Sequence, residues 1–277
     1  MPSVHPTAIL EGDVDLADDV VVGPHCVLSG PITLGAGTRL IGNVYLYGPL
    51  VAGSDNTIYP FACLGFAPQH SAFDPRTSGP GVLIGSGNTF REQVTVHRAL
   101  TDEGPTTIGD GNCFMAGSHV GHDSRVGNEC VFVNHAMLGG HVIVEDRVTV
   151  GAASFVHQFC HIGRGVMFAG AAGTTRDVPP YFMITGINIC GSVNLVGLRR
   201  SDRPRDQIDD ARWVYRTLYR KGLSMKAAKE ALKERADRPM VAEYLRFIAS
   251  SERGLCPAKG QAVRGMAGEE GTKARRH

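Results

Sequence analysis

The chain has 277 residues, of which 43% are hydrophobic and 20% are charged, so it can bury a core and is not disordered throughout. It has no run of 18 apolar residues, which excludes a membrane-spanning helix. The overall charge of +1 hides an uneven distribution. Residues 1–197 carry a net charge of −8 and no Lys, whereas residues 198–277 carry a net charge of +9, which indicates two regions.

The N-terminal residues and the cysteines together favour a cytoplasmic location. The opening segment, residues 1–5, lacks the basic and apolar parts of a signal peptide. The seven Cys form no C-x-x-C pair, so we expect no disulfide framework. We also expect neither stable membrane insertion nor nucleic-acid binding.

A six-residue repeat dominates the first region. A first run covers residues 16–69, a second restarts at Ile84, and eleven consecutive hexads from Ile108 to Gly173 open with Ile, Val, Leu or Phe. This period is typical of a parallel β-helix, in which three hexads form one 18-residue triangular coil with the branched residue inside. The aromatic content of 7% is expected, because we expect a narrow prism to have no room for large rings.

Breaks in the repeat divide the chain. Two insertions, residues 66–81 and 99–107, interrupt a β-helix that we expect over residues 1–185. A connector and a helical domain follow over 186–254, with one helix in 204–221, one capped by Ser224 and one begun by Pro239. The basic tail, 255–277, lacks periodicity and is expected to be disordered.

The 18-residue coil predicts which side chains meet. Residues 18 apart share a face, one coil apart, so one segment supplies two neighbouring columns: His122, Gly140 and Gln158, and beside them Asp123, His141 and Phe159. His119 and His157 lie next to these columns. The sequence therefore predicts a patch of polar, proton-accepting residues.

The chemistry that suits this patch is acyl transfer to a hydroxyl. A neutral His122 can accept a proton near pH 7, and a carboxylate beside it can fix its tautomer. A glycine on the next coil, Gly140, offers an unobstructed backbone N–H to a developing oxyanion. The chain has no G-x-S-x-G motif. We therefore expect direct attack of a bound acceptor on a thioester, without a covalent intermediate.

Metal binding is the rival interpretation. Three His around an open position can hold a catalytic zinc, as in the γ-class carbonic anhydrases, which are also hexapeptide β-helices. His135 and His141 are six residues apart, one full side of the prism, so they should not converge within one chain. We therefore expect no metal, although a metal protein or a scaffold stays an alternative.

Several segments together resemble one family, the acyl-(acyl-carrier-protein)–UDP-N-acetylglucosamine O-acyltransferases of lipid A biosynthesis. Hexapeptides alone are shared by many acyltransferases, but these segments follow in the family's order over about residues 4–254. They are Val4-His5-Pro6-Thr7-Ala8, Arg91-Glu92 with Thr95 and His97-Arg98, His119 with His122-Asp123 and Val126-Gly127-Asn128, Gly139-Gly140-His141, Val156-His157-Gln158-Phe159-Cys160, Asp177-Val178-Pro179-Pro180-Tyr181 and Gly197-Leu198-Arg199-Arg200.

The resemblance implies a left-handed β-helix in a homotrimer, with active sites between subunits and an acyl-carrier-protein (ACP) thioester as co-substrate instead of a cofactor. It implies that His122 is the general base, that Asp123 orients it and that the Gly140 N–H binds the oxyanion. Gly170 matches the position that helps set acyl-chain length. The implied substrate-binding residues are His97, His119, His141, His157, Gln158, Asn194, Arg199 and Arg200.

Two departures from the family pattern leave an alternative acceptor open. The first insertion usually carries an acidic residue and a Lys, in a stretch like PQDLKY, whereas residues 68–73 here read PQHSAF. Val196 replaces a usual Glu. A divergent paralogue that acylates another nucleotide sugar, including a 3-amino analogue, is therefore the alternative.

The basic second region predicts where the donor docks. Acyl carrier proteins are generally acidic, and the family docks its donor partly on the helical domain. Arg212, Arg216 and Arg220 repeat every four residues and should share one helical face. We expect this face to contact the acyl carrier protein.

Overall fold

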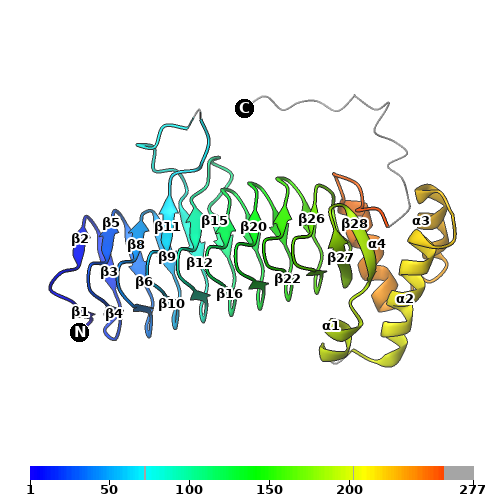
Figure 1. The fold of residues 1–277 in the computed structure, drawn as a ribbon, viewed down its shortest axis with the longest axis horizontal. Coiled ribbons are helices and arrows are strands. Elements are labelled where there is room, and N and C mark those ends of the chain that lie inside the picture. The colour runs from blue at the N-terminus through cyan, green and yellow to red at the C-terminus, as the bar shows by residue number, and fades with distance from the viewer. Residues whose placement is uncertain (72, 202, 259–277) are drawn as a thin grey trace.

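A parallel β-helix with helices at its C-terminal end makes up the molecule (Figure 1). The computed structural model describes residues 1–71, 73–201 and 203–258. From β1 to β26, every third strand enters the same sheet, so three sheets, here named A, B and C, form the sides of a triangular prism. The predicted fold class, a parallel β-helix followed by a small helical domain, is confirmed.

Short strands, most of them two or three residues long, build each side. The strands of sheet A are β1 (Ser3–Val4), β4 (Val21–Val22), β7 (Arg39–Leu40), β10 (Thr57–Ile58), β13 (Thr89–Phe90), β16 (Cys113–Phe114), β19 (Val131–Phe132), β22 (Thr149–Val150), β25 (Met167–Phe168), β27 (Phe182–Gly186) and β28 (Ile189–Val193). The strands of sheet B are β2 (Ile9–Glu11), β5 (Val27–Ser29), β8 (Tyr45–Tyr47), β11 (Cys63–Phe66), β14 (Thr95–His97), β17 (His119–Val120), β20 (Met137–Leu138), β23 (Phe155–Val156) and β26 (Gly173–Thr174). The strands of sheet C are β3 (Val14–Leu16), β6 (Ile32–Leu34), β9 (Leu50–Ala52), β12 (Val82–Ile84), β15 (Thr106–Ile108), β18 (Arg125–Val126), β21 (Ile143–Val144) and β24 (His161–Ile162).

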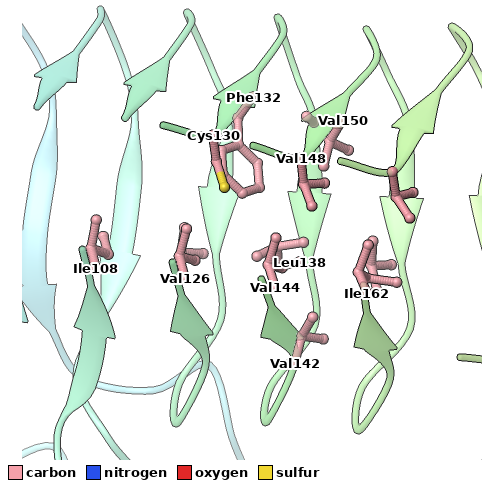
Figure 2. Packing of buried hydrophobic residues seen from close by; sticks show 14 of the residues in the cluster. Ile108, Val126, Cys130, Phe132, Leu138, Val142, Val144, Val148, Val150 and Ile162 are labelled. Atoms are coloured by element: carbon pink, nitrogen blue, oxygen red, sulfur yellow. The ribbon is translucent and has the colours of Figure 1, made fainter. Parts of the chain in front are cut away.

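The branched residue that opens each hexad points into the prism. In sheet C, Ile108, Val126, Val144 and Ile162 pair in register and form a row of buried side chains (Figure 2). Each is at most 4% exposed, so the apolar area that it removes from water stabilises the coil. The pairing repeats every 18 residues and keeps surface columns in register as well.

Large rings do fit inside the prism, so the expectation that they would not is wrong. Phe90, Phe114 and Phe132 are fully buried in sheet A, with ring centroids 5.0 and 4.7 Å apart and planes within 10° of parallel. Phe168 is also fully buried, one coil beyond Val150. Stacked on one side of the prism, the rings occupy the same place in successive coils and fill the interior together.

The first insertion extends from β11 to β12 and stands out from the prism as a loop (Figure 1). The second is shorter than its predicted range of 99–107. Thr106 and Thr107 belong to β15, because they pair with Val82 and Leu83 of β12. The loop thus ends at Pro105, where the register of sheet C resumes.

The last coils join the helical domain without a clear break. The predicted boundary at residue 185 falls inside β27, which pairs with β25 and then antiparallel with β28. Helix α1 (Leu195–Arg200) lies in the expected connector, followed by α2 (Arg205–Tyr219), α3 (Met225–Lys233) and α4 (Pro239–Ser250). Ser224 caps α3 through the Ala227 N–H, and Pro239 opens α4, as the sequence predicts.

The start of the tail is ordered, contrary to expectation. Leu255 bridges to Asp177, Ala258 bridges to Cys190, and Cys256 is fully buried. Residues 259–277, for which disorder was also expected, lie outside the described residues. All seven cysteines are free thiols. Within the described ranges, no helix is long and apolar enough to cross a membrane.

Candidate active site

The predicted columns meet at the corner between sheets B and C. The N–H of His141 donates to the carbonyl of His122, and the N–H of Phe159 donates to the carbonyl of Gly140, so successive coils stack there in register. Asp123, His141 and Phe159 all have left-handed backbones, with φ of +57°, +57° and +64°. The expected columns are therefore confirmed, and one corner conformation places three side chains in line.

His122 and Asp123 form a hydrogen-bonded pair. His122 Nδ1 lies 2.6 Å from Asp123 Oδ2, and the side chains are 15% and 7% exposed. An ionised carboxylate only accepts hydrogen bonds, so Nδ1 carries the proton and Nε2 is left as the acceptor. The pair is thus arranged as a base, His122, whose ring is oriented by the Asp123 carboxylate.

Donors from the second insertion hold the Asp123 carboxylate. The N–H groups of Leu100 and Thr101 donate to it at 2.9 and 3.1 Å, and the Thr101 hydroxyl donates at 2.6 Å. Burial alone would raise the pKa of Asp123, but these donors and His122 hold that pKa well below its usual range. A fixed negative charge therefore stands beside the imidazole.

His141 and Phe159 extend the site along the corner. The His141 ring is edge-on to His122, with centroids 5.2 Å apart, and stacks on Phe159 at 4.5 Å. Its Nε2 lies 3.8 Å from Asp123 Oδ2. Burial lowers the pKa of His141, a shift that Asp123 opposes and His122 reinforces. A groove of about 370 Å³ begins here, with Arg125 and His161 further along its wall.

A second imidazole pair joins His119, on the same coil as His122, to His97, on the coil before. His97 and His119 are edge-on with centroids 5.1 Å apart, and His119 Nδ1 lies 2.8 Å from the Thr95 hydroxyl. Burial, then the nearby His119, His122 and Arg98, lower the pKa of His97 to about 4. Burial and His122 also lower the pKa of His119. Both rings are therefore neutral hydrogen-bonding groups near pH 7.

Gly140 lies directly against the His122 ring. A Cβ at this position would stand 2.5 Å from His122 Cε1 and 2.7 Å from Nε2. The Gly140 N–H donates no hydrogen bond within the described part of the chain. A backbone donor thus remains unused beside the basic nitrogen. One coil further, His157 and Gln158 are exposed at the same corner.

Other predicted residues lie elsewhere in this chain. Asn194 is 8% exposed, and its amide caps α1 through the Gly197 N–H and donates to the Gly165 carbonyl. Arg199 and Arg200 end α1, on the side of the molecule opposite to the insertions (Figure 1). Gly170 lies between β25 and β26, at the corner between sheets A and B. A single chain does not bring these residues to His122.

Sequence reasoning missed three contributors from the insertions. Leu100 and Thr101 hold Asp123, and His70 lies edge-on to His122 with ring centroids 6.5 Å apart. Insertions lack a repeat, so spacing could not assign their side chains to a column. The only signal was that both phase breaks lie shortly before the segment that carries His119, His122 and Asp123.

One trio of possible metal ligands occurs among the described residues. His122, Asp123 and His141 each offer a ligand atom, all within 4.8 Å of one another. His135 lies at another corner, between β19 and β20, as expected. The trio's carboxylate already accepts hydrogen bonds from His122, Leu100 and Thr101, an arrangement suited to proton transfer.

Comparison with known proteins groups the chain with one kind of acyltransferase. The family model described as UDP N-acetylglucosamine O-acyltransferase, domain 2, matches residues 177–256. A Halorhodospira halophila protein named acyl-(acyl-carrier-protein)–UDP-N-acetylglucosamine O-acyltransferase is 40% identical over 258 residues, which are 92% of this chain and 99% of that protein. A protein of the same name from Thermodesulfovibrio yellowstonii is 38% identical over 260 residues, 92% of this chain and 100% of that protein.

A solved structure agrees over nearly the whole length. The UDP-N-acetylglucosamine acyltransferase of Francisella novicida matches with a TM-score of 0.89 and 32% identity, over 97% of this chain and 100% of that chain. Coils of opposite hand cannot superpose this well. This chain therefore coils in the same direction as that protein.

Proposed function

The chain belongs to the acyl-(acyl-carrier-protein)–UDP-N-acetylglucosamine O-acyltransferase family, and on this premise we propose that it acylates the 3-hydroxyl of UDP-N-acetylglucosamine. The donor is the thioester of a (3-hydroxy)acyl chain on an acyl carrier protein, and the reaction belongs to lipid A biosynthesis. The observation that carries this proposal is the His122–Asp123 pair with the Gly140 backbone against its ring.

The residues of the corner suit a direct transfer. His122 Nε2 takes the proton of the acceptor hydroxyl while its oxygen attacks the thioester carbonyl carbon. Asp123 holds Nδ1–H and stabilises the imidazolium that forms. The Gly140 N–H donates to the oxyanion. Collapse of the intermediate expels the carrier thiolate, which takes the proton back from His122, so the products are an ester and a free thiol.

A second copy of the chain completes the site in this proposal. Arg199, Arg200 and Gly170 lie away from His122 in one chain, so they reach an acceptor bound there only from a neighbour. We therefore propose a homotrimer with sites between subunits, where Asn194 shapes α1 and the two Arg side chains bind the nucleotide. Light scattering should give three times the chain mass, and an active monomer would contradict this.

Gly170 helps to set the length of the acyl chain in the same arrangement. A Cβ there would meet only the Ala152 carbonyl at 3.7 Å, so the backbone has room for a side chain and the groove stays open to a long chain. Gly170→Met should shift the preferred donor to shorter acyl chains. An unchanged preference across a series of acyl-ACP lengths would remove Gly170 from this role.

One observation keeps a second acceptor under consideration. His70 stands near His122 in the insertion whose usual acidic residue and Lys are absent, and Val196 is 56% exposed on α1 where a Glu is usual. These changes affect groups that would face the sugar or the nucleotide, and they spare the acyl-transfer residues. A 3-amino analogue of the acceptor is therefore the second candidate.

A product assay separates the two acceptors. Purified protein is incubated with acyl-ACP and, separately, with UDP-N-acetylglucosamine, its 3-amino analogue and UDP-N-acetylgalactosamine, and products are weighed by mass spectrometry. We expect O-acylated UDP-N-acetylglucosamine as the fastest product. Faster acylation of the amine would establish the alternative, and no acylated sugar with any of them would overturn both.

A further inference from the structure

Arg98 is a fully buried cation without a carboxylate partner among the described residues. It is 1% exposed, and its side chain donates to the carbonyls of Gly65, Pro75 and Thr77 at 3.2, 2.8 and 2.7 Å. Burial lowers its pKa. Desolvating a guanidinium is costly, so its burial against these carbonyls indicates that the hydrogen bonds have a structural role.

The three carbonyls belong to the first insertion and its approach. The loop begins after Gly65, whose φ is +86°, and returns at Gly81, whose φ is +82°. A Cβ at either glycine would strike the backbone of Tyr47 or Pro49. Between these fixed ends, the Arg98 fork ties down the returning limb at residues 75–77. Arg98 therefore sets the position of a loop that the repeat does not specify.

Aromatic rings surround the same guanidinium. Its carbon lies 5.3 Å from the ring centroid of Tyr47, which belongs to the prism, and 5.6 Å from that of Phe73, which belongs to the loop. Both distances are within the range of a cation–π contact, which is stronger when desolvated. We call Arg98 with these two rings and the three carbonyls the clamp. It joins the loop to the coil through side chains as well as through carbonyls.

The clamped loop brings His70 to the active-site corner. The N–H of His70 donates to Pro68, and its carbonyl accepts from Phe73, so a tight turn presents the imidazole. Its ring stands at 82° to that of His122, with 6.5 Å between centroids. His70 therefore borders His122 on the side of the first insertion.

The backbone that carries Arg98 also organises the catalytic pair. Two and three residues after Arg98, the chain supplies the Leu100 and Thr101 donors that hold Asp123. The preceding residue is His97, packed against His119. One short segment thus contacts the loop on one side and the base–acid pair on the other.

We propose that Arg98 is a positioning residue, which fixes the first insertion so that His70 borders the acceptor's entry to His122. This rests on the proposed function, because it takes the nucleotide sugar as the acceptor. Release of the clamp moves the loop and misplaces the acceptor, while the donor's docking surface on the helical domain is unaffected.

A kinetic cycle tests the proposal with Arg98→Met, Arg98→Lys, His70→Ala and the Arg98→Met/His70→Ala double variant. We expect the KM for the nucleotide sugar to rise about 10-fold in Arg98→Met and the KM for acyl-ACP to stay within about 2-fold, since small misplacements weaken productive binding. Arg98→Lys, which keeps the charge without the planar fork, should fall between parent and Arg98→Met. His70→Ala should raise the same KM, and the double variant should be no worse than Arg98→Met.

The matched control is Arg91→Met. Arg91 belongs to the same sequence motif but is exposed and paired with Glu92, so its loss should leave both KM values unchanged. Each of three results would overturn the proposal. The KM for the nucleotide sugar could stay at the parental value in Arg98→Met or in His70→Ala, or the increases caused by the two single substitutions could multiply in the double variant.

Trypsin provides a readout that needs no substrate. Arg76 lies in the clamped limb with its side chain 89% exposed, and cleavage after it requires the loop to open locally. We expect cleavage about 10-fold faster in Arg98→Met than in the parent or Arg91→Met, with an unchanged circular dichroism spectrum. Equal cleavage rates in Arg98→Met and the parent would overturn the clamp, even if the parent acylated no sugar at all. If Arg98→Met is cleaved faster but the parent acylates no sugar, only the proposed function is rejected.

Discussion

Two adjacent residues with different backbone conformations build the proposed catalytic pair, His122 and Asp123. Neighbouring side chains in a strand point to opposite faces, but Asp123 has a φ of +57° and turns the chain at the corner. Its carboxylate therefore meets the imidazole of His122 at 2.6 Å. Spacing in the sequence predicts that these residues share a corner. It could not predict the Leu100 and Thr101 donors, because the insertion that carries them has no repeat.

Gly140→Ala tests how closely the backbone approaches the base. The added Cβ would stand 2.5 Å from His122 Cε1, so the imidazole must turn away and its bond to Asp123 must lengthen. We expect kcat/KM to fall roughly 100-fold, the loss typical of one displaced catalytic group, with a native thermal unfolding midpoint. Steady-state kinetics beside a melting curve measures both. Parental kcat/KM would show that the ring and the glycine N–H are not used together.

Buried His97 makes stability depend on pH in a defined window. Its pKa is about 4 in the folded chain and about 6.5 in the unfolded chain. The unfolded chain thus binds a proton first as the pH falls, and the contribution of His97 is complete above pH 6.5 and decreases toward pH 4. Urea unfolding of the parent at pH 7 and pH 5, at one protein concentration, measures this loss.

His97→Gln should remove about 2 kcal/mol of the loss between pH 7 and pH 5, because an amide does not titrate in that range. Nearby His119 and His141 shift in the same direction, so some pH dependence should persist in the variant. Identical pH dependence in parent and variant would show that His97 is not buried as a neutral group.

At the scale of the strand and the coil, the hexad pattern predicts most of the prism, because each hexad of six residues forms one side of a coil. The expectation that large rings would not fit was wrong for the Phe side chains. A ring fits inside the prism when the next coil stacks a second ring on it. Helix α1 was missed because its six residues give too short a pattern. Residues 255–258 were missed because their order comes from distant partners, Asp177 and Cys190.

A ladder of buried amides should stabilise the middle coils. The Asn88 side chain and N–H donate to Asn56 Oδ1, while Asn88 Oδ1 accepts from the N–H and the side chain of Asn112. Asn88→Ala leaves the N–H and the side-chain amide of Asn112 buried without their acceptor, while Asn56 Oδ1 keeps only the backbone N–H of residue 88, so we expect the free energy of unfolding to fall by about 3 kcal/mol. Denaturant unfolding measures it, with exposed Asn134→Ala as the control. Equal losses in the two variants would refute the ladder's role.

At the scale of the whole molecule, the candidate residues spread over more than one face. His122 lies at one corner of the prism and Gly170 at another. Helix α1 lies on the side of the molecule opposite to the insertions. The sequence predicts the columns of one chain, but it contains no signal for how copies of the prism face each other. The arrangement of copies that we propose rests on the separation of these candidate residues within a single chain.

The helical domain is the proposed docking surface for the acidic carrier protein. Arg212 and Arg216 line a shallow groove of about 550 Å³ beside β28, and Arg220 is exposed at the end of α2. Attraction between opposite charges weakens as the Debye length shrinks to about 8 Å at 0.15 M salt. The KM for acyl-ACP should therefore rise with ionic strength, while the KM for the nucleotide sugar changes less.

Charge reversal of Arg212, Arg216 and Arg220 to Glu should raise the donor KM about 10-fold in low-salt buffer, because steering and contact are both lost. The matched control reverses Lys226 and Lys229, which lie on α3. Donor KM values that agree between the α2 variant and the parent at low salt would place the docking surface elsewhere.

If the His122 imidazole is the base for direct acyl transfer, His122→Ala should lose most of its turnover while it keeps its fold. The measurement is kcat/KM for formation of acylated nucleotide sugar by this variant and by the parent, at saturating acyl-ACP and equal trimer content. His122 lies at the surface of a corner, so its loss should leave folding intact and should slow turnover by roughly 10²–10⁴-fold. A variant that folds and acylates the sugar at close to the parental rate would contradict the account.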